Sequence, residues 1–364
     1  MNEGIYRQLG EVMAKRGLGG RPTNVPEYDT MLRVLFTPDE AESSCVMPPG
    51  YFTPNVISQA TGKNESDVTI TLEKMADKGL CMSVVRKGAR VYVGPPLMPG
   101  IFEFQFMRGT KTERDYEIAR AINAYRKAAA SVTVIPRRAS YPGSRVIPVQ
   151  RTIKAETSVQ TFDQVRNYIE NSEPIAVTTC YCRHEALLID EKDICGMPND
   201  VCMQFRTSAE YLIERKIGRQ VSKDEAMDVM RRAEEAGLVH ACVNTQRLDF
   251  ICNCCACHCA ILQNVLRQPR PADAILHAFL PSFGEETCTL CGICTDRCPA
   301  KALSINGGNL PEWNAERCIG CAVCASGCPE GTIVMVERQG AFVPPADMRT
   351  LGEVIAKERS RADF

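Results

Sequence analysis

The sequence lacks several features that would point to other classes of protein. It has no run of about 18 apolar residues, so we predict no membrane-spanning helix. Its start, MNEGIYRQLGEVMAKRG, lacks the apolar stretch of a signal peptide. The formal net charge of −1 shows no basic excess that would indicate nucleic-acid binding. No GxGxxG follows a strand, and GLGG at 17–20 lacks the preceding strand and the Lys-Ser/Thr of a P-loop. These absences argue against membrane, secreted and nucleotide-binding proteins.

Cysteine is unusually abundant. The chain of 364 residues has 20 cysteines, and 17 of them lie in tight clusters between Cys180 and Cys328. Their spacings are those of metal ligands, which must be reduced thiolates rather than disulfides. We therefore expect a reducing cytoplasm, and an anaerobic organism because exposed iron–sulfur cubanes are labile to oxygen.

The C-terminal part of the chain contains the unit C-x2-C-x2-C-x3-C-P twice. This is the run of bacterial ferredoxins, in which three cysteines of one run hold a [4Fe–4S] cluster and the fourth holds the other. A disulfide cage or two zinc sites are the alternatives, but two identical spacings with both prolines argue against them. The expected ligands are Cys288, Cys291, Cys294 and Cys328 for the first cluster, and Cys318, Cys321, Cys324 and Cys298 for the second.

The stretch 37–94 predicts short helices followed by a hairpin. Thr37-Pro38 and Thr53-Pro54 are typical of helix starts, and a further helix is expected from Asn64 to Gly79. CMSVVRKGARVYVG then alternates as a hairpin does. This order predicts a winged helix, with DNA binding or protein docking as its function. Acidic residues outnumber lysines on the helix 65–78, which favours docking.

The next segment predicts a strand, a helix and an extended connection. Phe102, Phe104 and Phe106 alternate as in a core strand, with a partner-facing patch as the alternative. A helix is expected from Thr112 to Ala130 because acids stand early and Arg126-Lys127 late. Three prolines exclude a long helix from 131–150.

A second cysteine constellation occupies the middle of the chain. Helices near 206–216 and 223–236 are expected to bring its two cysteine groups together. Nine thiols suffice for one or two metal sites, and we predict at least one further Fe–S cluster, with structural zinc as the alternative. His258 lies among them as a ligand, or as a residue beside the ligands or in solvent. Arg183 is expected either to donate a hydrogen bond to cluster sulfur or to form a surface salt bridge. The candidate ligands are Cys180, Cys182, Cys195, Cys202, Cys252, Cys254, Cys255, Cys257 and Cys259.

Six segments spread over the chain carry a resemblance to known proteins. They are TPDEA at 37–41, MPPGYFTP at 47–54, FEFQFMRGT at 102–110, TTCYCRH at 178–184, AEEAGLVH at 233–240 and ICNCC at 251–255. With these segments the whole chain resembles a family of dicluster 4Fe–4S ferredoxin-like proteins of anaerobic bacteria. The resemblance implies a winged-helix-like N-terminal region, a central CxCR…CNCC domain, a pseudo-twofold ferredoxin domain and a role as an electron-transfer subunit. His258 stands where relatives often have a further Cys, and the CCG signature of heterodisulfide reductase subunits is missing.

We therefore expect an α+β multidomain protein. The leading hypothesis is a carrier or electron-entry subunit that exchanges electrons with redox protein partners in a larger oxidoreductase complex. The alternatives are a redox-responsive transcription regulator and an enzyme whose central cluster binds substrate. The expected parts are a winged-helix-like module at 1–105, a helical or extended connector at 106–173, a helical cysteine-rich domain at 174–272, the dicluster domain at 273–340 and a C-terminal helix or tail at 341–364.

Overall fold

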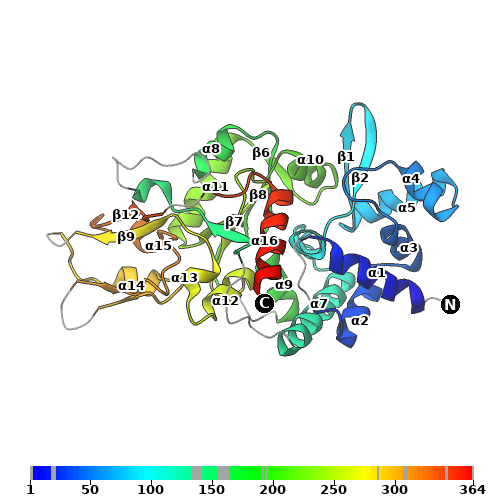
Figure 1. Ribbon diagram of the computed structural model, residues 1–364. Coiled ribbons are helices and arrows are strands. Elements are labelled where there is room, and N and C mark those ends of the chain that lie inside the picture. Colours follow the sequence, from blue (N-terminus) through cyan, green and yellow to red (C-terminus); the bar gives the residue numbers. More distant parts are fainter. Residues whose placement is uncertain are drawn as a thin grey trace. The chain divides into compact units, whose positions relative to one another are not determined.

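The computed structural model divides the chain into two compact units, which are described one after the other (Figure 1). The first contains 1–135, 181–194 and 209–219, and the second contains 136–180, 195–208 and 220–364. Among the described residues, no helix combines the length and the apolar character needed to cross a bilayer. The structure describes residues 3–17, 22–132, 141–153, 164–190, 192, 195–284, 287–305, 310–340 and 343–362.

The first unit begins with helices that lead into a hairpin. Thr37 accepts a hydrogen bond from the Glu40 N–H and Glu40 accepts one from the Thr37 N–H, so this predicted helix start is confirmed as a capping box. The order agrees with the one that the sequence predicts, and the winged-helix assignment itself stays a prediction. The elements are α1 (Glu3–Lys15), α2 (Pro26–Leu35), α3 (Pro38–Cys45), α4 (Pro54–Thr61), α5 (Glu65–Asp77), β1 (Met82–Arg86) and β2 (Ala89–Val93).

The predicted core strand at Phe102–Phe106 is wrong, because this segment is the short helix α6 (Phe102–Phe106) after the irregular turn η1 (Leu97–Ile101). Its three phenylalanines are all buried, with Phe102 against Tyr125 and Phe104 against Tyr211. A one-turn helix that is covered on most sides shows no 3.6-residue period, so its pattern imitates a strand. The predicted helix that follows is confirmed as α7 (Glu113–Val132).

Two later segments of the chain complete the first unit. They are α9 (Tyr181–Ile189) and the end of α10 (Arg206–Glu214) with the residues after it. Arg126 forms an ion pair with the buried Glu185 of α9 at 2.6 Å. Arg215 pairs with Glu73 and Asp77 of α5 at 2.8 Å each. The two pairs of Arg215 neutralise part of the negative charge of α5 within the unit itself.

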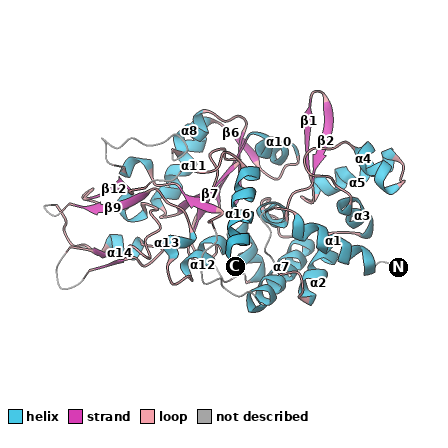
Figure 2. Ribbon diagram, in the orientation of Figure 1, coloured by secondary structure: helices cyan, strands magenta, loops and turns pink. Residues whose placement is uncertain are grey.

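The second unit contains a six-stranded sheet in the order β3-β7-β8-β5-β4-β6. Figure 2 draws strands in magenta and labels two strands of this sheet, β6 and β7. The prediction of a helical middle domain therefore needs correction. The two expected helices are present as α10 and as α11 (Lys223–Glu235), where Ser222 accepts a hydrogen bond from the Glu225 N–H. The strands are β3 (Ser144–Val146), β4 (Ile175–Thr179), β5 (Asp200–Phe205), β6 (Arg219–Val221), β7 (Val239–Val243) and β8 (Phe250–Cys254).

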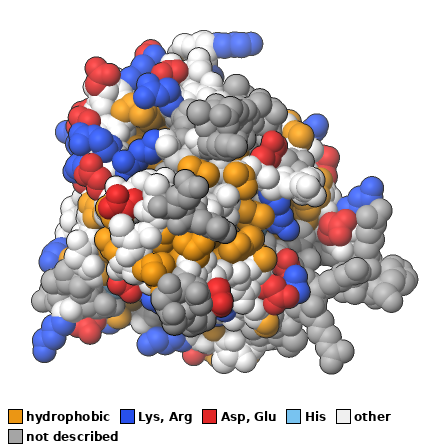
Figure 3. Space-filling view, turned by 90° about the vertical axis from the view of Figure 1, so that its left-hand side faces the viewer, with side chains coloured by type: hydrophobic (Ala, Val, Ile, Leu, Met, Phe, Trp, Pro, Cys, Tyr) orange, Lys and Arg blue, Asp and Glu red, His pale blue; other side chains and the backbone are white. Residues whose placement is uncertain are grey.

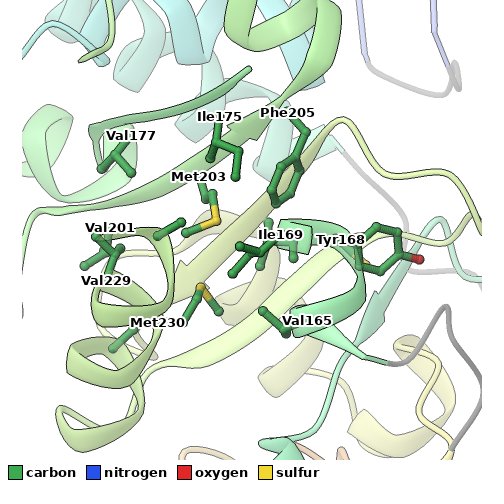
Figure 4. Packing of buried hydrophobic residues seen from close by; sticks show 14 of the residues in the cluster. Val165, Tyr168, Ile169, Ile175, Val177, Val201, Met203, Phe205, Val229 and Met230 are labelled. Atoms are coloured by element: carbon green, nitrogen blue, oxygen red, sulfur yellow. The ribbon is translucent and has the colours of Figure 1, made fainter. Parts of the chain in front are cut away.

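One face of this sheet forms the main core of the second unit. Met203 and Phe205 of β5 pack with Ile169 of α8 (Val165–Glu170) and with Val229 and Met230 of α11 (Figure 4). These side chains are almost fully buried. Because successive strand residues point to opposite faces, the alternate residues of β5 and β8 are left for the other face.

The C-terminal part of the second unit holds two small antiparallel ribbons. The alternating segment TIVMVER at 332–338 predicts a closing strand, and β12 (Ile333–Glu337), which pairs with β9 (Phe279–Phe283), confirms it. The predicted C-terminal helix is confirmed as α16 (Met348–Ala362). The second ribbon pairs β10 (Leu303–Ser304) with β11 (Glu312–Trp313). The remaining elements are η2 (Gln150–Thr152), α12 (Ala260–Leu266), α13 (Pro271–Ala274), α14 (Ile293–Arg297) and α15 (Val323–Ser326).

Candidate metal centres

The two C-terminal cysteine runs fold as a repeat with an offset of thirty residues, the distance from Cys288 to Cys318. A short helix follows the second cysteine of each run, α14 in the first and α15 in the second. Left-handed backbone recurs at matching positions, so the repeat of the sequence is also a repeat of the backbone. The matching pairs are Leu290 and Gly320, Gly292 and Ala322, and Lys301 and Gly331.

Each quartet of cysteines that the spacing assigns to one cluster lines one cavity. The first cavity takes three thiols from the first run and Cys328 from the second. The second cavity takes three thiols from the second run and Cys298 from the first. The exchange of the fourth cysteine is the arrangement that the two-cluster ferredoxin run requires. Four thiols around a mostly apolar hollow fit a [4Fe–4S] cluster in each cavity.

The surroundings of the two cavities shift the pKa values of the cysteine thiols. Burial raises the pKa of Cys324 to about 12, and nearby Cys298 and Cys318 add to this shift. Burial opposes ionisation of Cys328 too, but hydrogen bonds from the Thr332 side chain and from backbone N–H groups outweigh it and lower the pKa of this thiol. The Thr332 Oγ1 lies 3.1 Å from the Cys328 Sγ. Buried thiols of high pKa need a cation beside them to be thiolates, as a metal cluster provides.

Sheet register brings cysteines of the middle segment together. In the pairing of β5 with β8, Met203 is opposite Ile251 and Gln204 is opposite Phe250, so the same register sets Cys202 opposite Cys252. Cys254 lies two residues beyond Cys252 and therefore shares its face. That face is the one turned away from the core. Strand pairing thus gathers thiols that are far apart in sequence.

Two further thiols belong to this group. Cys180 directly follows β4, and Thr178 of that strand is paired with Cys202. A negative charge on Cys180 raises the pKa of Cys202. Cys259 caps α12 and places its Sγ 3.2 Å from the Sγ of Cys254. The pKa of Cys202 is raised, mainly by a hydrogen bond with Cys252 and to a smaller extent by burial. We call these residues the five-thiol group: Cys180, Cys202, Cys252, Cys254 and Cys259.

The other middle cysteines form a separate group with His258. Cys195 precedes β5, and the rest come from the turn after β8. The ligand atoms of all four residues lie within 4.8 Å of one another. Burial and the neighbouring Cys255 and Cys195 thiols raise the pKa of Cys257 to about 12. We call these residues the Cys3His group: Cys195, Cys255, Cys257 and His258.

Two of the residues that the sequence predicts near a middle cluster lie outside both groups. Cys182 and Arg183 belong to α9 of the first unit, where both are buried. No sequence motif selects Asn253, although its side chain contacts the His240 Nδ1 at 2.6 Å and donates to the Val201 carbonyl at 2.6 Å. Asn253 thus ties β8 to its neighbours on both sides. Its position between two cysteines, CNC, was the only available signal.

Three isolated cysteines are expected to be buried hydrophobes. Cys81 and Cys242 are buried, which confirms the prediction for these two. Cys45 is only partly buried, with its Sγ 3.9 Å from the Ile5 carbonyl oxygen. None of them belongs to the five-thiol or the Cys3His group.

Comparison with known proteins agrees with the geometry of the C-terminal cavities. The family model described as a 4Fe-4S dicluster domain matches residues 280–332, a range that contains both cysteine runs. The search of curated proteins and the search of solved structures each find no match. The chain therefore carries a 4Fe–4S dicluster domain, and its cysteine clusters fit an iron–sulfur protein that transfers electrons.

Proposed function

We propose that this protein is an electron carrier or electron-entry subunit of a larger redox enzyme complex. The observation that carries the proposal is the lining of the two cavities, since each holds the four thiols that one cubane needs. Cys288, Cys291, Cys294 and Cys328 would hold the first cluster, and Cys318, Cys321, Cys324 and Cys298 the second. When bound, such clusters take up and release single electrons.

The five-thiol group is the proposed site of a third Fe–S cluster. It offers one thiol more than a cubane requires, and Cys202, Cys252 and Cys254 lie on one face of the sheet. The sheet fixes the backbone of these residues, so the ligands need little ordering when a cluster binds. Four of these five thiols would be the cluster ligands, which narrows the nine candidate cysteines of the middle segment to five.

A short route through the protein links this third site to the dicluster domain. Cys254 is paired with Val239 across β8 and β7, and Gly237 lies two residues before Val239. A Cβ built on Gly237 would be 3.4 Å from the Arg297 guanidinium and 3.6 Å from the Val323 side chain. Val323 begins α15, directly before Cys324. This packing supports electron transfer between the middle site and the second cubane.

The dicluster domain also offers a surface for a redox partner. Figure 3 views the side on which β9, β12 and α14 lie in Figure 1, and apolar side chains gather in its middle with charged ones around them. Leu290 and Ile293 are both 38% exposed and stand on either side of the exposed Cys291. Apolar exposure beside a cluster ligand is typical of a site where a protein partner docks. Electrons would leave or enter through the first cubane.

The geometry gives less support to DNA binding. Arg90 of the hairpin donates to the Glu214 carboxylate at 2.8 Å, and Arg86 lies over the Tyr51 ring at 5.4 Å. In a DNA-binding winged helix, Arg86, Lys87 and Arg90 of this hairpin would touch phosphates, and two of these three residues thus have partners within the first unit. We therefore place the first unit's function in protein docking.

The test is metal analysis and spectroscopy of the full chain purified without oxygen. We expect about eight irons for the dicluster domain and about four more for the third site, with equal inorganic sulfide. The double variant Cys202→Ala/Cys252→Ala leaves only three thiols in the five-thiol group, so it should lose the third cluster and keep the paired EPR signals of the dicluster domain. A protein that contains no iron, or whose clusters accept no electron from dithionite or a deazaflavin reductant, would refute the proposal.

A further inference from the structure

The Cys3His group differs in compactness from every other cysteine group that the structure describes. Its three sulfurs and one imidazole nitrogen all lie within 4.8 Å of one another. Across the described residues, no other set of three or more His, Cys, Asp or Glu ligand atoms meets this condition. The two quartets of the dicluster domain do not meet it, and neither does the five-thiol group. The closer spacing of its ligand atoms therefore distinguishes the Cys3His group from the expected cubane ligands of the same chain.

Ligand spacing distinguishes a single metal ion from a cubane. Four ligands around one zinc ion at about 2.3 Å stand about 3.8 Å apart at the corners of a tetrahedron. Thiolates of a cubane project from four separate irons and stand roughly 6 Å apart. The Cys255 Sγ and the His258 Nδ1 are 3.9 Å apart, which fits one shared ion. A cubane would have to push these groups outward.

We propose that Cys195, Cys255, Cys257 and His258 bind one zinc ion as a closed Cys3His site, separate from any iron–sulfur cluster of the middle domain. Three thiolates and one imidazole are a common donor set of structural zinc. Zinc also binds such ligands more tightly than ferrous iron does. This proposal goes beyond electron transfer and does not depend on it.

The position of the group assigns this zinc ion a structural task. Cys195 lies shortly before β5 and Cys255 directly after β8, and these two strands are antiparallel neighbours. The start of one strand therefore lies beside the end of the other, and the ion would fasten them together. Cys202 and Cys254 of the five-thiol group stand on the same two strands. The zinc ion has no redox chemistry, so it would fasten the ends of β5 and β8 to each other and carry no electrons.

The test compares metal contents of variants of the full chain, purified without oxygen. The parent should contain about one zinc that resists a mild chelator, besides its iron and sulfide. His258→Ala should lose this zinc, with iron and sulfide unchanged. The matched control is the double variant Cys202→Ala/Cys252→Ala, which leaves only three thiols in the five-thiol group and should lose iron and sulfide and keep the zinc. Zinc K-edge absorption of the parent should show three sulfurs and one nitrogen.

Two results would overturn the proposal. One is a parent without zinc in which His258→Ala lowers iron and sulfide together, because the group would then belong to a cluster. The other is zinc that remains in both His258→Ala and Cys195→Ala, because it would then be bound elsewhere. If His258→Ala does not fold, His258→Cys decides. It should keep the zinc and change its absorption spectrum to four sulfurs, and an unchanged spectrum would refute the assignment.

Discussion

The guanidinium of Arg297 donates a hydrogen bond to the backbone carbonyl of Glu234 at 3.0 Å, and a second to the carbonyl of Glu235 at 3.1 Å. Arg297 ends α14 inside the first cysteine run, and the two carbonyls belong to the last turn of α11. A cation at this end of a helix meets the last carbonyls of the helix and the negative end of its dipole. These contacts join the first cysteine run to the end of α11.

Arg297→Ala should loosen this junction. Loss of two partly exposed charge-assisted hydrogen bonds should lower the free energy of unfolding by about 1–2 kcal/mol. It should also slow electron equilibration between the third site and the dicluster domain after flash reduction. Arg317→Ala is the control, because the Arg317 Nε donates to the Ala300 carbonyl within the dicluster domain. Equal effects of both variants on the transfer rate would contradict the role of Arg297.

Thr332→Val should make the potential of the first cluster more negative. A ligating Cys328 thiolate carries no proton, so the Thr332 hydroxyl at 3.1 Å must be the donor. Such a bond stabilises the reduced and more negative cluster, and a difference of about 1 kcal/mol corresponds to roughly 40 mV for one electron. An EPR-monitored redox titration measures the shift. In the control Thr295→Val the lost hydroxyl bonds the Gly292 carbonyl, so the potential should stay within error.

The sequence predicts the dicluster domain well because its information is local. Spacing within each run is that of cluster ligands in two-cluster ferredoxins, and proline and glycine mark the turns. The division of the middle cysteines into two groups has another origin. It depends on the register of β5 against β8, whose residues are about fifty positions apart, and spacing carries no record of such pairing. Periodicity fails for Phe102–Phe106 for the different reason that the helix is short and buried on most sides.

Gly320→Ala should damage the second cluster site far more than Gly331→Ala damages the first. Both glycines have φ of +63°, so both variants bear the strain of a left-handed alanine, about 1 kcal/mol. Only at Gly320 would the new Cβ overlap the Phe279 carbonyl oxygen and approach the His277 ring to 2.8 Å, whereas nothing lies within 4 Å of Gly331. Backbone overlap should cost several kcal/mol in total. Thermal unfolding of the holo-protein and its iron content measure the difference, and equal losses would contradict the close contact.

His277 should make the dicluster domain sensitive to mild acid. The ring is buried, its Nδ1 lies 3.2 Å from the Ile275 carbonyl, and Arg338 approaches its Nε2 at 3.4 Å. Burial lowers the pKa of His277, and the positive charge of Arg338 adds to this although the Ile275 carbonyl opposes it. The unfolded chain therefore binds more protons than the native protein below about pH 6.5, the ordinary value for histidine.

The free energy of unfolding should consequently be highest above about pH 6.5. It should fall as the pH is lowered below this value, until the pH reaches the lowered pKa of His277 in the native protein. His277→Phe keeps a buried ring without a titrating nitrogen, so the thermal midpoint should depend less on pH between about 7.5 and 5. Arg338→Met should also reduce the acid sensitivity, because it removes the charge that disfavours protonation. Thermal unfolding under anaerobic conditions, followed by cluster absorption, gives these midpoints. Unchanged pH dependence in both variants would assign the acid response to other groups.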